Sequence, residues 1–586
     1  MCGFYFQYNK EKHEFVNTSE ILKLLEHRGP DDKGIYKSKK ILAIHTLLKI
    51  QDISSKSKQP FSIRFKKKIF NIIYNGEIYN KDEIKKKITK ISNYKFKTDG
   101  DTELFLLSFI FLGKNFIKEI EGMYAFVIWE EKTNKIYFGR DQFVQKPLYY
   151  FNSKKYLILS SEIKPILKAL RFYKEKVFFN KDTIKNYLLT GNFSNNEKTF
   201  FNSVNQISGG TIRSLLRGKI KTKKILKLKK FSKNKKINDI NQFESFSENV
   251  VKQHLIGKVK TGIALSSGAD SLYLLYLISK NKKLSKNLTA FTFGFEKHKN
   301  EIKEAKKICK KLKISHTVIY LKKNEILNNF QKFIEYCEFP IAGLPSIAMF
   351  RLCKKAREKG VKVLVGGYGL DEHFGSYKTF LNKKLKLNQF VDGRILNHYK
   401  FLKNPTKKKY KKNFEQDFYE KKINYFLDIK IPRTSLMSDR YSMSNSVEFR
   451  NPFLDRRIYD FVNQIQYKYL RSGKKDIIIN ILKKNLMFKG NYKKNYFVSP
   501  QEEYMKDFNV IKFLKNVLND KEFRVFLNFL NINKIIKDIK KNQILAWQLM
   551  NIYYFYQTFK VYIYSKNLVK SKKISNIIRN TNKIIK

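Results

Sequence analysis

The hydrophobic pattern of this 586-residue chain changes near residue 240, and that change constrains its fold more than any other feature. Residues 1–205 alternate short apolar runs with turn signals such as Asn75-Gly76, a pattern typical of β-strands. From residue 242, buried strands alternate with helices, which predicts a doubly wound parallel sheet with helices on both faces. The chain is also too long for one core, so we expect an α+β domain followed by an α/β domain with added helices.

Apolar runs and turn signals mark the elements that we expect in each part. The strands of the first part are 41–45, 69–74, 125–129 and 135–139, and its helices are 19–26 and 101–112. The strands of the second part are 260–265, 288–293 and 361–365. Residues 212–240 are lysine-rich and poorly patterned, which indicates a linker with room for one strand. The expected domains are 2–205 and 242–565, joined by a linker at 206–241 and followed by a basic tail at 566–586.

The formal net charge of +69 raises the question of a polyanionic partner, such as RNA or a membrane surface. Lysine is scattered over every segment and heavily outnumbers arginine, the residue that suits bidentate phosphate recognition. We therefore attribute the charge to compositional bias and expect no nucleic-acid partner. The polar, basic tail after Val569 is the exception to this uniform distribution.

The chain has no apolar run near the roughly 20 residues that span a bilayer, and its amino terminus lacks the pattern of a signal peptide. Its four cysteines show no CxxC spacing and are too few for a disulfide framework: Cys2, Cys309, Cys337 and Cys353. We expect a cytoplasmic protein without a membrane partner. Three of the cysteines lie in apolar or helical contexts typical of core residues, and only Cys2 calls for a chemical interpretation.

Cys2 follows the initiator methionine. Removal of Met1 would leave an α-amine, with a pKa near 8, on the same residue as a thiol, so one residue could supply both nucleophile and base. An amide carbonyl attacked by this thiolate needs donors for its oxyanion. Asn75 and Gly76, after the strand expected at 69–74, could donate a side-chain amide and a backbone N–H. Without further motifs, a cysteine at position 2 occurs more often by chance than as a catalytic residue.

A catalytic role for Cys2 is supported by seven short strings in residues 1–164, because they occur in the order and spacing of one family. They are MCGF at 1–4, HRGPD at 27–31, NGEIYN at 75–80, GDTE at 100–103, EGMYAF at 121–126, GRDQFVQKPLYY at 139–150 and SSEIK at 160–164. Residues 1–205 thus resemble the class II glutamine amidotransferase domain, an N-terminal-nucleophile hydrolase built as a four-layer α/β/β/α sandwich.

This resemblance implies that Cys2 attacks the γ-amide of glutamine, forms a glutamyl thioester and releases ammonia. Asn75 and Gly76 would form the oxyanion hole, and Asp101 would bind the α-ammonium group. The implied glutamine-binding set is Gln51, Asn75, Gly76, Glu77 and Asp101.

One position departs from the family pattern. Leu47 stands where the family has an arginine that pairs with the α-carboxylate of glutamine. The loss of a hydrogen bond to a charged partner costs about 1.5–3 kcal/mol. We therefore expect one of three outcomes: weak glutamine binding, a substitute cation such as Lys49, or the use of free ammonia.

A second constellation begins where the strand 260–265 runs into SSGADS at 266–271 and then into a helix at 272–278. Small residues let the backbone approach a phosphate, and N–H groups at a helix start attract anions. No lysine follows the glycine, so this is not the GxxxxGK(S/T) loop. Taken alone, such a loop is as often an ordinary strand–turn–helix.

The strand 361–365 supports the phosphate interpretation, because it enters GGYGLDEHFGSY at 366–377. Asp371 then follows one parallel strand and Asp270 another, and ligands bind beyond the carboxyl ends of such strands. Two carboxylates together with phosphates form the usual magnesium arrangement. The sequence therefore predicts a site for ATP and Mg²⁺, with Asp270 and Asp371 as metal ligands.

The same strings resemble the synthetase domain of asparagine synthetases, and the match continues over residues 240 to 510. Further strings are FTFGFE at 291–296, EFPIAGLPS at 338–346, DRYSMSNSVEFRNPFLD at 439–455 and KNYFVSPQ at 494–501. The family transfers AMP from ATP to a carboxylate and lets ammonia displace the AMP. The resemblance implies ATP-binding roles for Leu265, Ser266, Ser267, Gly268, Asp270, Ser271, Phe293, Gly366 and Gly367, and catalytic roles for Tyr368 and Lys475.

Several positions depart from the asparagine synthetase pattern. Ser267 replaces a loop glycine, which is tolerable if its φ is negative. Tyr368 stands where asparagine synthetases commonly carry an acidic residue, and a tyrosine there is more similar to the related β-lactam synthetases. Met437 replaces a basic residue. The catalytic lysine aligns ambiguously with Asp476 or, after a shift of one residue, with Lys475; we choose Lys475.

Four functions remain open at this stage. The first is a glutamine-dependent asparagine synthetase acting on aspartate, with ammonia passing between the sites through an internal tunnel. The second is the same chemistry on another small carboxylate, such as a sugar acid or a β-lactam precursor. The third is an RNA-modifying enzyme, which would need a catalytic thiol pair, and the fourth is an inactive relative. A homodimer is also left open.

Overall fold

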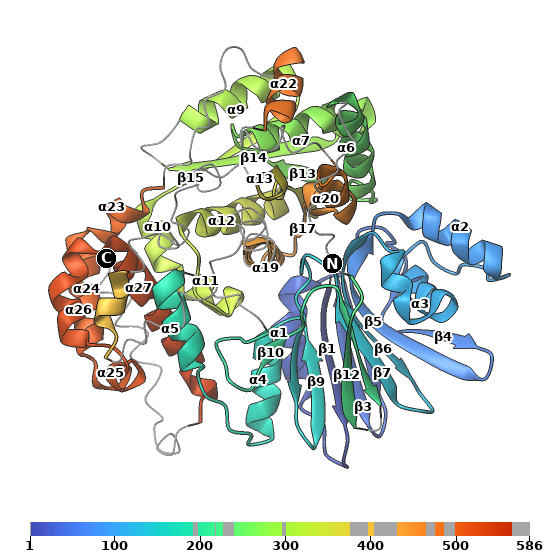
Figure 1. The fold of residues 1–586 in the computed structure, drawn as a ribbon, viewed down its shortest axis with the longest axis horizontal. Helices are drawn as coiled ribbons and strands as arrows, with labels where there is room; N and C mark the ends of the chain where they lie inside the picture. Colours follow the sequence, from blue (N-terminus) through green and yellow to red (C-terminus); the bar gives the residue numbers. More distant parts are fainter. Residues whose placement is uncertain are drawn as a thin grey trace.

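The computed structural model describes residues 2–191, 197–216, 218–226, 240–295, 300–374, 397–403, 430–464, 475–485 and 499–564. Two domains and a carboxy-terminal helical layer surround a common centre (Figure 1). The expected tail at 566–586, residues 217 and 227–239 of the expected linker, and residues 296, 375–377 and 494–498 of the quoted strings lie outside the described residues.

The amino-terminal domain consists of two antiparallel sheets, coloured blue to green at the lower right of Figure 1. The first sheet has the order β10 (Asn205–Gln206), β8 (Tyr149–Asn152), β9 (Tyr156–Ser160), β1 (Cys2–Asn9), β3 (Ile41–Leu47) and β2 (Asp32–Lys37). The second has the order β12 (Lys219–Lys224), β11 (Thr211–Leu216), β7 (Lys135–Arg140), β6 (Gly122–Glu130), β5 (Lys68–Ile78) and β4 (Phe61–Phe65). The four strands expected in this part are confirmed.

The two sheets face each other across an apolar core that includes Phe4, Phe6, Ile73, Val127 and Trp129. Helices α1 (Thr18–Leu25) and α4 (Ile163–Phe172) pack on the first sheet, and α2 (Lys81–Ile91) and α3 (Asp101–Leu112) cover the second. The α/β/β/α sandwich implied by the family resemblance is therefore present, because each sheet buries one face on its partner and the other under helices.

Residues 211–224 differ from the expectation of a single strand. They form a hairpin of two strands, in which Leu216 pairs with Lys219 and β11 pairs with β7. The outer strand, KIKTKK, is exposed at every position except the half-buried Ile220. Its lysines therefore hid a β-strand from pattern analysis, although charged residues are a common way to protect the edge of a sheet.

The second domain contains a five-stranded sheet in which every neighbouring pair is parallel. Its order is β15 (Ser315–Leu321), β14 (Leu288–Phe295), β13 (Thr261–Ala264), β16 (Val363–Val365) and β17 (Glu448–Arg450). The chain moves outward from β13 in both directions, so the strand order reverses there. This is the place where doubly wound sheets bind ligands.

Helices cover both faces of this sheet, as predicted. One face carries α6 (Ile240–His254), α7 (Ala269–Ser279), α9 (Asn300–Lys311), α20 (Arg456–Val462) and α22 (Asp476–Lys484). The other carries α11 (Phe330–Cys337), α12 (Leu344–Glu358) and α19 (Ile431–Met443). Shorter helices are α8 (Lys282–Lys286), α10 (Lys323–Asn328) and α13 (Leu370–Phe374).

The carboxy-terminal helices form the layer at the left of Figure 1. They are α23 (Gln501–Met505), α24 (Phe508–Asn519), α25 (Lys521–Phe526), α26 (Ile532–Asp538) and α27 (Gln543–Phe559). Helix α27 packs on α11 of the second domain and on α5 (Lys181–Thr190) of the first, so it joins both domains. Within the described ranges, no helix is long and apolar enough to cross a membrane.

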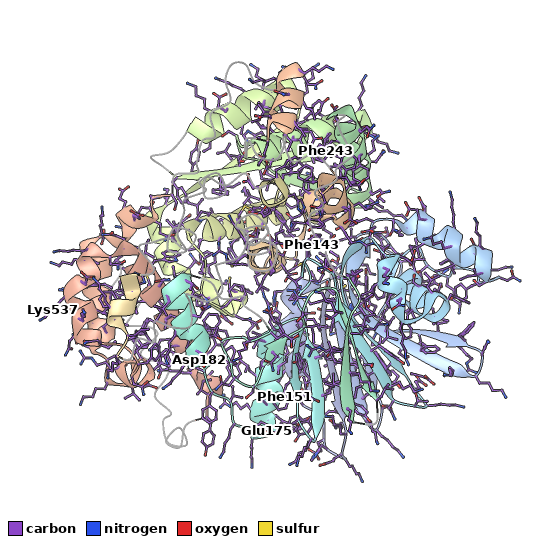
Figure 2. The ribbon with its side chains drawn as sticks, viewed as in Figure 1. Phe143, Phe151, Glu175, Asp182, Phe243 and Lys537 are labelled. Carbon is purple, nitrogen blue, oxygen red and sulfur yellow. The ribbon has the colours of Figure 1, made fainter. Side chains whose placement is uncertain are left out.

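Side chains fill the boundary between the two domains. Phe143, in the loop after β7, lies at this boundary in Figure 2. Its ring is 6.2 Å from that of His373 and 6.4 Å from that of Tyr459, both of the second domain. The domains are thus packed against each other directly.

Candidate active sites

Cys2 opens the first strand, in the middle of the first sheet, where it pairs with Leu47 of β3. Its backbone nitrogen donates a hydrogen bond to Asn75 Oδ1 at 3.0 Å. Cys2 itself is only 5% exposed. The predicted nucleophile and the predicted oxyanion donor are therefore neighbours, although 73 residues separate them in the chain.

Asn75 also carries a donor that is not used. Its Nδ2 is buried and has no hydrogen-bond partner among the described residues. A buried amide group without a partner is costly, so such groups in native proteins usually await a ligand or water. The geometry fits a donor held ready for an oxyanion beside the Cys2 thiol.

Burial raises the pKa of the Cys2 thiol, while the amino-terminal charge and a backbone hydrogen bond from Leu48 lower it. The net shift is upward, so the thiol is protonated at neutral pH. A nucleophile of this kind needs a base to remove its proton. The α-amine that removal of Met1 would expose is the group closest at hand.

A cavity of about 50 Å³ adjoins the thiol. Besides Cys2, its lining includes four of the five predicted glutamine-binding residues: Gln51, Gly76, Glu77 and Asp101. Gly76 allows close packing there, because a Cβ on it would lie 2.3 Å from the carbonyl oxygen of Met123. Leu47 also lines the cavity, as an apolar wall where a carboxylate-binding arginine was expected.

Two carboxylates meet behind this cavity. Asp101, at the start of α3, accepts the backbone N–H of Ile78 at 2.7 Å. Glu77 lies on β5 and pairs with Arg450 at 3.1 Å. Burial, and next the charge of Glu448, raise the pKa of Glu77 to about 8 even though Arg450 opposes the shift. Such a shift is typical of a functional carboxyl group in a dry pocket.

The second site is a cavity of about 370 Å³ beyond the carboxyl ends of β13, β14 and β16. Every predicted ATP-binding residue except Ser267 lines it: Leu265, Ser266, Gly268, Asp270, Ser271, Phe293, Gly366 and Gly367. Ser267 is tolerated in the loop because its φ is not in the left-handed region.

Hydrogen bonds hold the loop after β13 in shape. The hydroxyl groups of Ser266 and Ser271 are 2.8 Å apart, and Ser266 Oγ accepts the backbone N–H of Gly268 at 3.2 Å. Gly367 packs on the loop so closely that a Cβ on it would lie 2.9 Å from the carbonyl carbon of Asp270. The two motifs after β13 and β16 therefore form one compact phosphate-sized cradle.

Lys475 connects the two predicted metal ligands. Its ammonium group pairs with Asp270 and lies 2.5 Å from Asp371 Oδ1. Burial raises the pKa of Asp270 to about 6, with Lys475 opposing and Asp371 adding to the shift. Burial works against the charge on Lys475, but Asp270 and Asp371 outweigh it and raise the pKa of the lysine. Two carboxylates that converge on one cation form a donor set that also fits a divalent metal.

The backbone distinguishes Lys475 from its neighbour Asp476. Lys475 precedes α22 in a left-handed conformation with φ of 50°, and it is buried. Asp476 is exposed on the first turn of the helix. Lys66, Lys174 and Lys313 have the same conformation elsewhere in the chain, so the burial of Lys475 and its place in the cavity are what indicate a function. The lysine, as predicted, is the residue that faces the cavity.

Comparisons with known proteins agree with this geometry. Residues 1–226 match the family model of the glutamine amidotransferase domain, and residues 243–486 match that of asparagine synthase. A putative glutamine-hydrolyzing asparagine synthetase 2 of Methanocaldococcus jannaschii is 31% identical over 405 residues, which cover 65% of this chain and 76% of that relative. The chain belongs to the glutamine-hydrolyzing asparagine synthetase family.

Other members of the family are more distant. Glutamine-hydrolyzing asparagine synthetase 1 of Bacillus subtilis is 26% identical over 533 residues, which cover 79% of this chain and 81% of the relative. Asparagine synthetase B of Escherichia coli is 25% identical and is matched over 61% of its length. This synthetase is thus an enzyme that joins a glutamine amidotransferase domain to an ATP-dependent synthetase domain.

The structure gives this synthetase an interface that sequence reasoning missed. Arg28 donates two hydrogen bonds to Asp439, at 2.8 and 2.9 Å, and a third to the carbonyl oxygen of Cys2 at 3.2 Å. Arg440 pairs with Glu338 at 2.8 Å and with Glu162 at 3.0 Å. All of these groups are buried. Each charged residue lies in one of the quoted family strings, but no local pattern indicates which of them meet.

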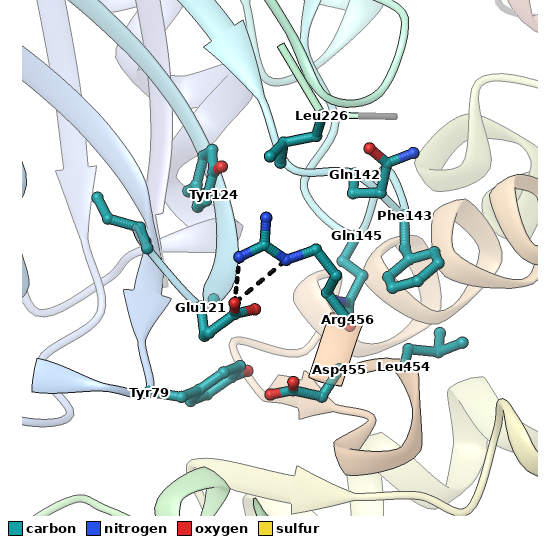
Figure 3. Close-up of a pocket in the computed structure, with 12 residues that line it drawn as sticks. Tyr79, Glu121, Tyr124, Gln142, Phe143, Gln145, Leu226, Leu454, Asp455 and Arg456 are labelled. Carbon is teal, nitrogen blue, oxygen red and sulfur yellow. Dashed lines mark hydrogen bonds and ion pairs between the residues drawn. The ribbon is translucent and has the colours of Figure 1, made fainter. Parts of the chain in front are cut away.

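A second contact between the domains surrounds a small cavity of about 20 Å³ (Figure 3). Arg456 donates to Glu121 through Nε at 3.1 Å and through Nη2. Tyr79 and Asp455 line the same cavity from opposite domains. Burial, followed by the charge of Asp455, raises the pKa of Glu121 to about 7. Charged side chains thus connect the two domains at two separate places.

The remaining cysteines contradict the RNA-modifying alternative. Cys309, Cys337 and Cys353 are buried and free of disulfides. Burial raises the pKa of Cys309 to about 11 and that of Cys337 to about 12, and it raises that of Cys353 still further. Thiols of this kind are poor nucleophiles, so none of the three offers a catalytic pair.

Proposed function

We propose that this synthetase makes asparagine from aspartate, with glutamine as nitrogen donor and ATP as energy source. The products would be asparagine, AMP, pyrophosphate and glutamate. The observation that carries the proposal is Lys475 held between Asp270 and Asp371, in a cavity large enough for a nucleotide.

In the glutaminase half, the thiol of Cys2 attacks the γ-carbonyl of glutamine, and the α-amine of Cys2 takes up the thiol proton. Asn75 Nδ2 and the backbone N–H of Gly76 stabilise the oxyanion. Glu77 and Asp101 hold the α-ammonium group, with Gln51 beside them. The α-ammonium group of Cys2 then returns this proton to the leaving nitrogen, so that collapse of the tetrahedral intermediate releases ammonia and leaves a glutamyl thioester, which water hydrolyses to glutamate.

In the synthetase half, Leu265, Phe293, Gly366 and Gly367 form the nucleotide wall, and the loop 266–271 holds the phosphates. Asp270 and Asp371 would hold Mg²⁺, which supplies charge neutralisation for the pyrophosphate leaving group. Lys475 adds positive charge at the same place. Tyr368, whose hydroxyl is 3.4 Å from that of Tyr441, would face the acyl-adenylate.

The test is a pyrophosphate-release assay with ATP, Mg²⁺ and a panel of carboxylic acids, run first with glutamine and then with ammonium. We expect release with aspartate and either nitrogen source, and equal amounts of asparagine and pyrophosphate. Release that does not depend on aspartate would reject the assignment of the acceptor. If no acid of the panel gives pyrophosphate release, the synthetase function itself is rejected.

The second candidate function is the same ATP-driven amidation with another small carboxylate in place of aspartate as the acceptor. Tyr368 carries a hydroxyl where aspartate-using relatives have a carboxylate, and Gly343 lacks the acid that those enzymes often have. A Cβ on Gly343 would lie 3.0 Å from Gln501 Oε1, so a side chain at this position would require the end of the Gln501 side chain to shift. Pyrophosphate release with a sugar acid or a β-amino acid in the same panel would favour this candidate.

The cytoplasmic location and the homodimer that the family resemblance leaves open are further parts of the proposal. Light scattering of the purified chain across a range of concentrations would decide between monomer and dimer.

A further inference from the structure

A lysine lies beside the two carboxylates proposed to bind the α-ammonium group of glutamine. Lys81 is the first residue of α2, immediately after the NGEIYN string. Its ammonium group is 3.2 Å from Asp101 Oδ1 and donates to the carbonyl oxygen of Asp99 at 2.7 Å. The side chain is 13% exposed. These contacts fix a positive charge at the edge of the glutamine cavity.

The side-chain amide of Gln51 lies among these charges. Its Nε2 donates to Glu77 and, at 3.2 Å, to Asp101 Oδ2. Its Oε1 accepts a hydrogen bond from Lys81. The amide thus turns its donor end toward two carboxylates and its acceptor end toward an ammonium group. The head group of an α-amino acid has the same polarity at full charge, so it would make stronger hydrogen bonds in the same place.

Neither of the other candidate positions offers an equivalent charge. Leu47 is apolar and 8% exposed. Lys49 lines the cavity, but its ammonium group is 3.7 Å from Asp32 on the neighbouring strand β2, and its backbone N–H donates to Asp31. Of these three side chains, only Lys81 contacts both Asp101 and Gln51.

We infer that Lys81 binds the α-carboxylate of glutamine, in place of the arginine missing at position 47, and that the Gln51 amide moves aside when the substrate enters. A second cavity of about 460 Å³ supports this movement, because Gln51 lines both cavities and Lys81 lines the larger one. The larger cavity also reaches Gln253 and Lys258 of the second domain. The inference rests on the proposed glutaminase function.

The experiment compares two substrates in the full-length enzyme. Glutamine carries the α-carboxylate, and 4-aminobutanamide is the same molecule without it. In the native enzyme we expect kcat/KM to be about 10- to 150-fold higher for glutamine than for 4-aminobutanamide. This ratio corresponds to the free energy of one hydrogen bond to a charged group. Lys81→Met should remove most of this preference through KM for glutamine and leave 4-aminobutanamide unchanged. Lys81→Arg should retain it.

Lys49→Met is the matched control, and pyrophosphate release driven by ammonium verifies that each variant is folded. The inference is overturned if Lys81→Met affects both substrates equally, which would indicate a role through Asp101 alone. It is also overturned if Lys49→Met, and not Lys81→Met, removes the preference. If the native enzyme releases no glutamate from glutamine, the proposed glutaminase function fails together with it.

Discussion

The two pockets of this synthetase use the same components, two carboxylates and a lysine, but they obtain their charge balance differently. In the nucleotide pocket, Lys475 bridges Asp270 and Asp371 within one domain. In the glutamine pocket, Lys81 pairs with Asp101, whereas Glu77 depends on Arg450 of the other domain. The nucleotide pocket is therefore electrostatically self-contained, and the glutamine pocket is complete only when the domains are joined.

The pKa values express the same contrast. Asp270, flanked by its own lysine, has a pKa of about 6, and Glu77 has a pKa of about 8. At neutral pH Asp270 is mostly ionised and Glu77 is mostly protonated. Glutamine binding should therefore respond to pH and to domain contacts more strongly than ATP binding does.

The strongest test separates the two pockets chemically. Cys2→Ala removes the nucleophile, so glutamate release should fall by at least about 10³-fold. Pyrophosphate release with aspartate and ammonium should stay within a factor of two of the native rate, because that chemistry belongs to the other pocket. A comparable loss of the ammonium reaction would show that the pockets are not independent.

The second test removes a charge that joins the domains. Asp439→Asn leaves Arg28 buried with only part of its charge compensated, which should cost about 3–5 kcal/mol of unfolding free energy. Denaturant unfolding measures this loss. Asp182→Asn is the matched control, because Asp182 is exposed on the first turn of α5 (Figure 2). A loss below about 1 kcal/mol would mean that the pair contributes little.

The third test removes the lysine from the nucleotide pocket. Lys475→Met should lower pyrophosphate release by about 10²- to 10³-fold, the usual effect of removing one charge-stabilising donor. Glutamate release should persist. Lys483→Met, on the exposed face of the same helix, provides the control. If the two variants behave alike, Lys475 has only a structural role.

The smallest effect is the pH dependence of glutamine binding. The pKa of Glu77 is raised to about 8, so raising the pH from 7 to 8.5 ionises this carboxyl group and strengthens its attraction for the α-ammonium group. KM for glutamine should fall by several-fold over this range, following the fraction ionised. In Glu77→Gln the slope should disappear. An equal slope in the variant would assign the titration to another group.

Much of both sites could be predicted because their residues lie in short local strings. Cys2 begins β1 and Asn75 lies within β5 of the facing sheet, whereas the two aspartates follow the neighbouring parallel strands β13 and β16, beyond whose carboxyl ends ligands bind. Contacts between distant segments could not be predicted. Arg28 and Asp439 are separated by 411 residues, and no local pattern indicates that they meet.

Two other features were hidden for different reasons. Strand β12 reads as a linker because exposed lysines occupy an edge that needs only backbone hydrogen bonds. The choice between Lys475 and Asp476 depends on a left-handed backbone angle, which the sequence alone does not reveal. Lys81 escaped notice since it follows a family string and is not part of it.

The position of Glu338 has a practical consequence for dissecting this molecule. Its carboxylate accepts the first two N–H groups of α4, from Ile163 at 2.7 Å and Lys164 at 2.6 Å, and no side chain of the amino-terminal domain caps that helix. A fragment ending at residue 226 would begin this helix with exposed donors and would also lose Asp439, one of the two carboxylates that pair with Arg28. Excision of the glutaminase as a portable ammonia source would thus require a replacement cap, for instance an aspartate in place of Glu162, which keeps a carboxylate at the position that pairs with Arg28.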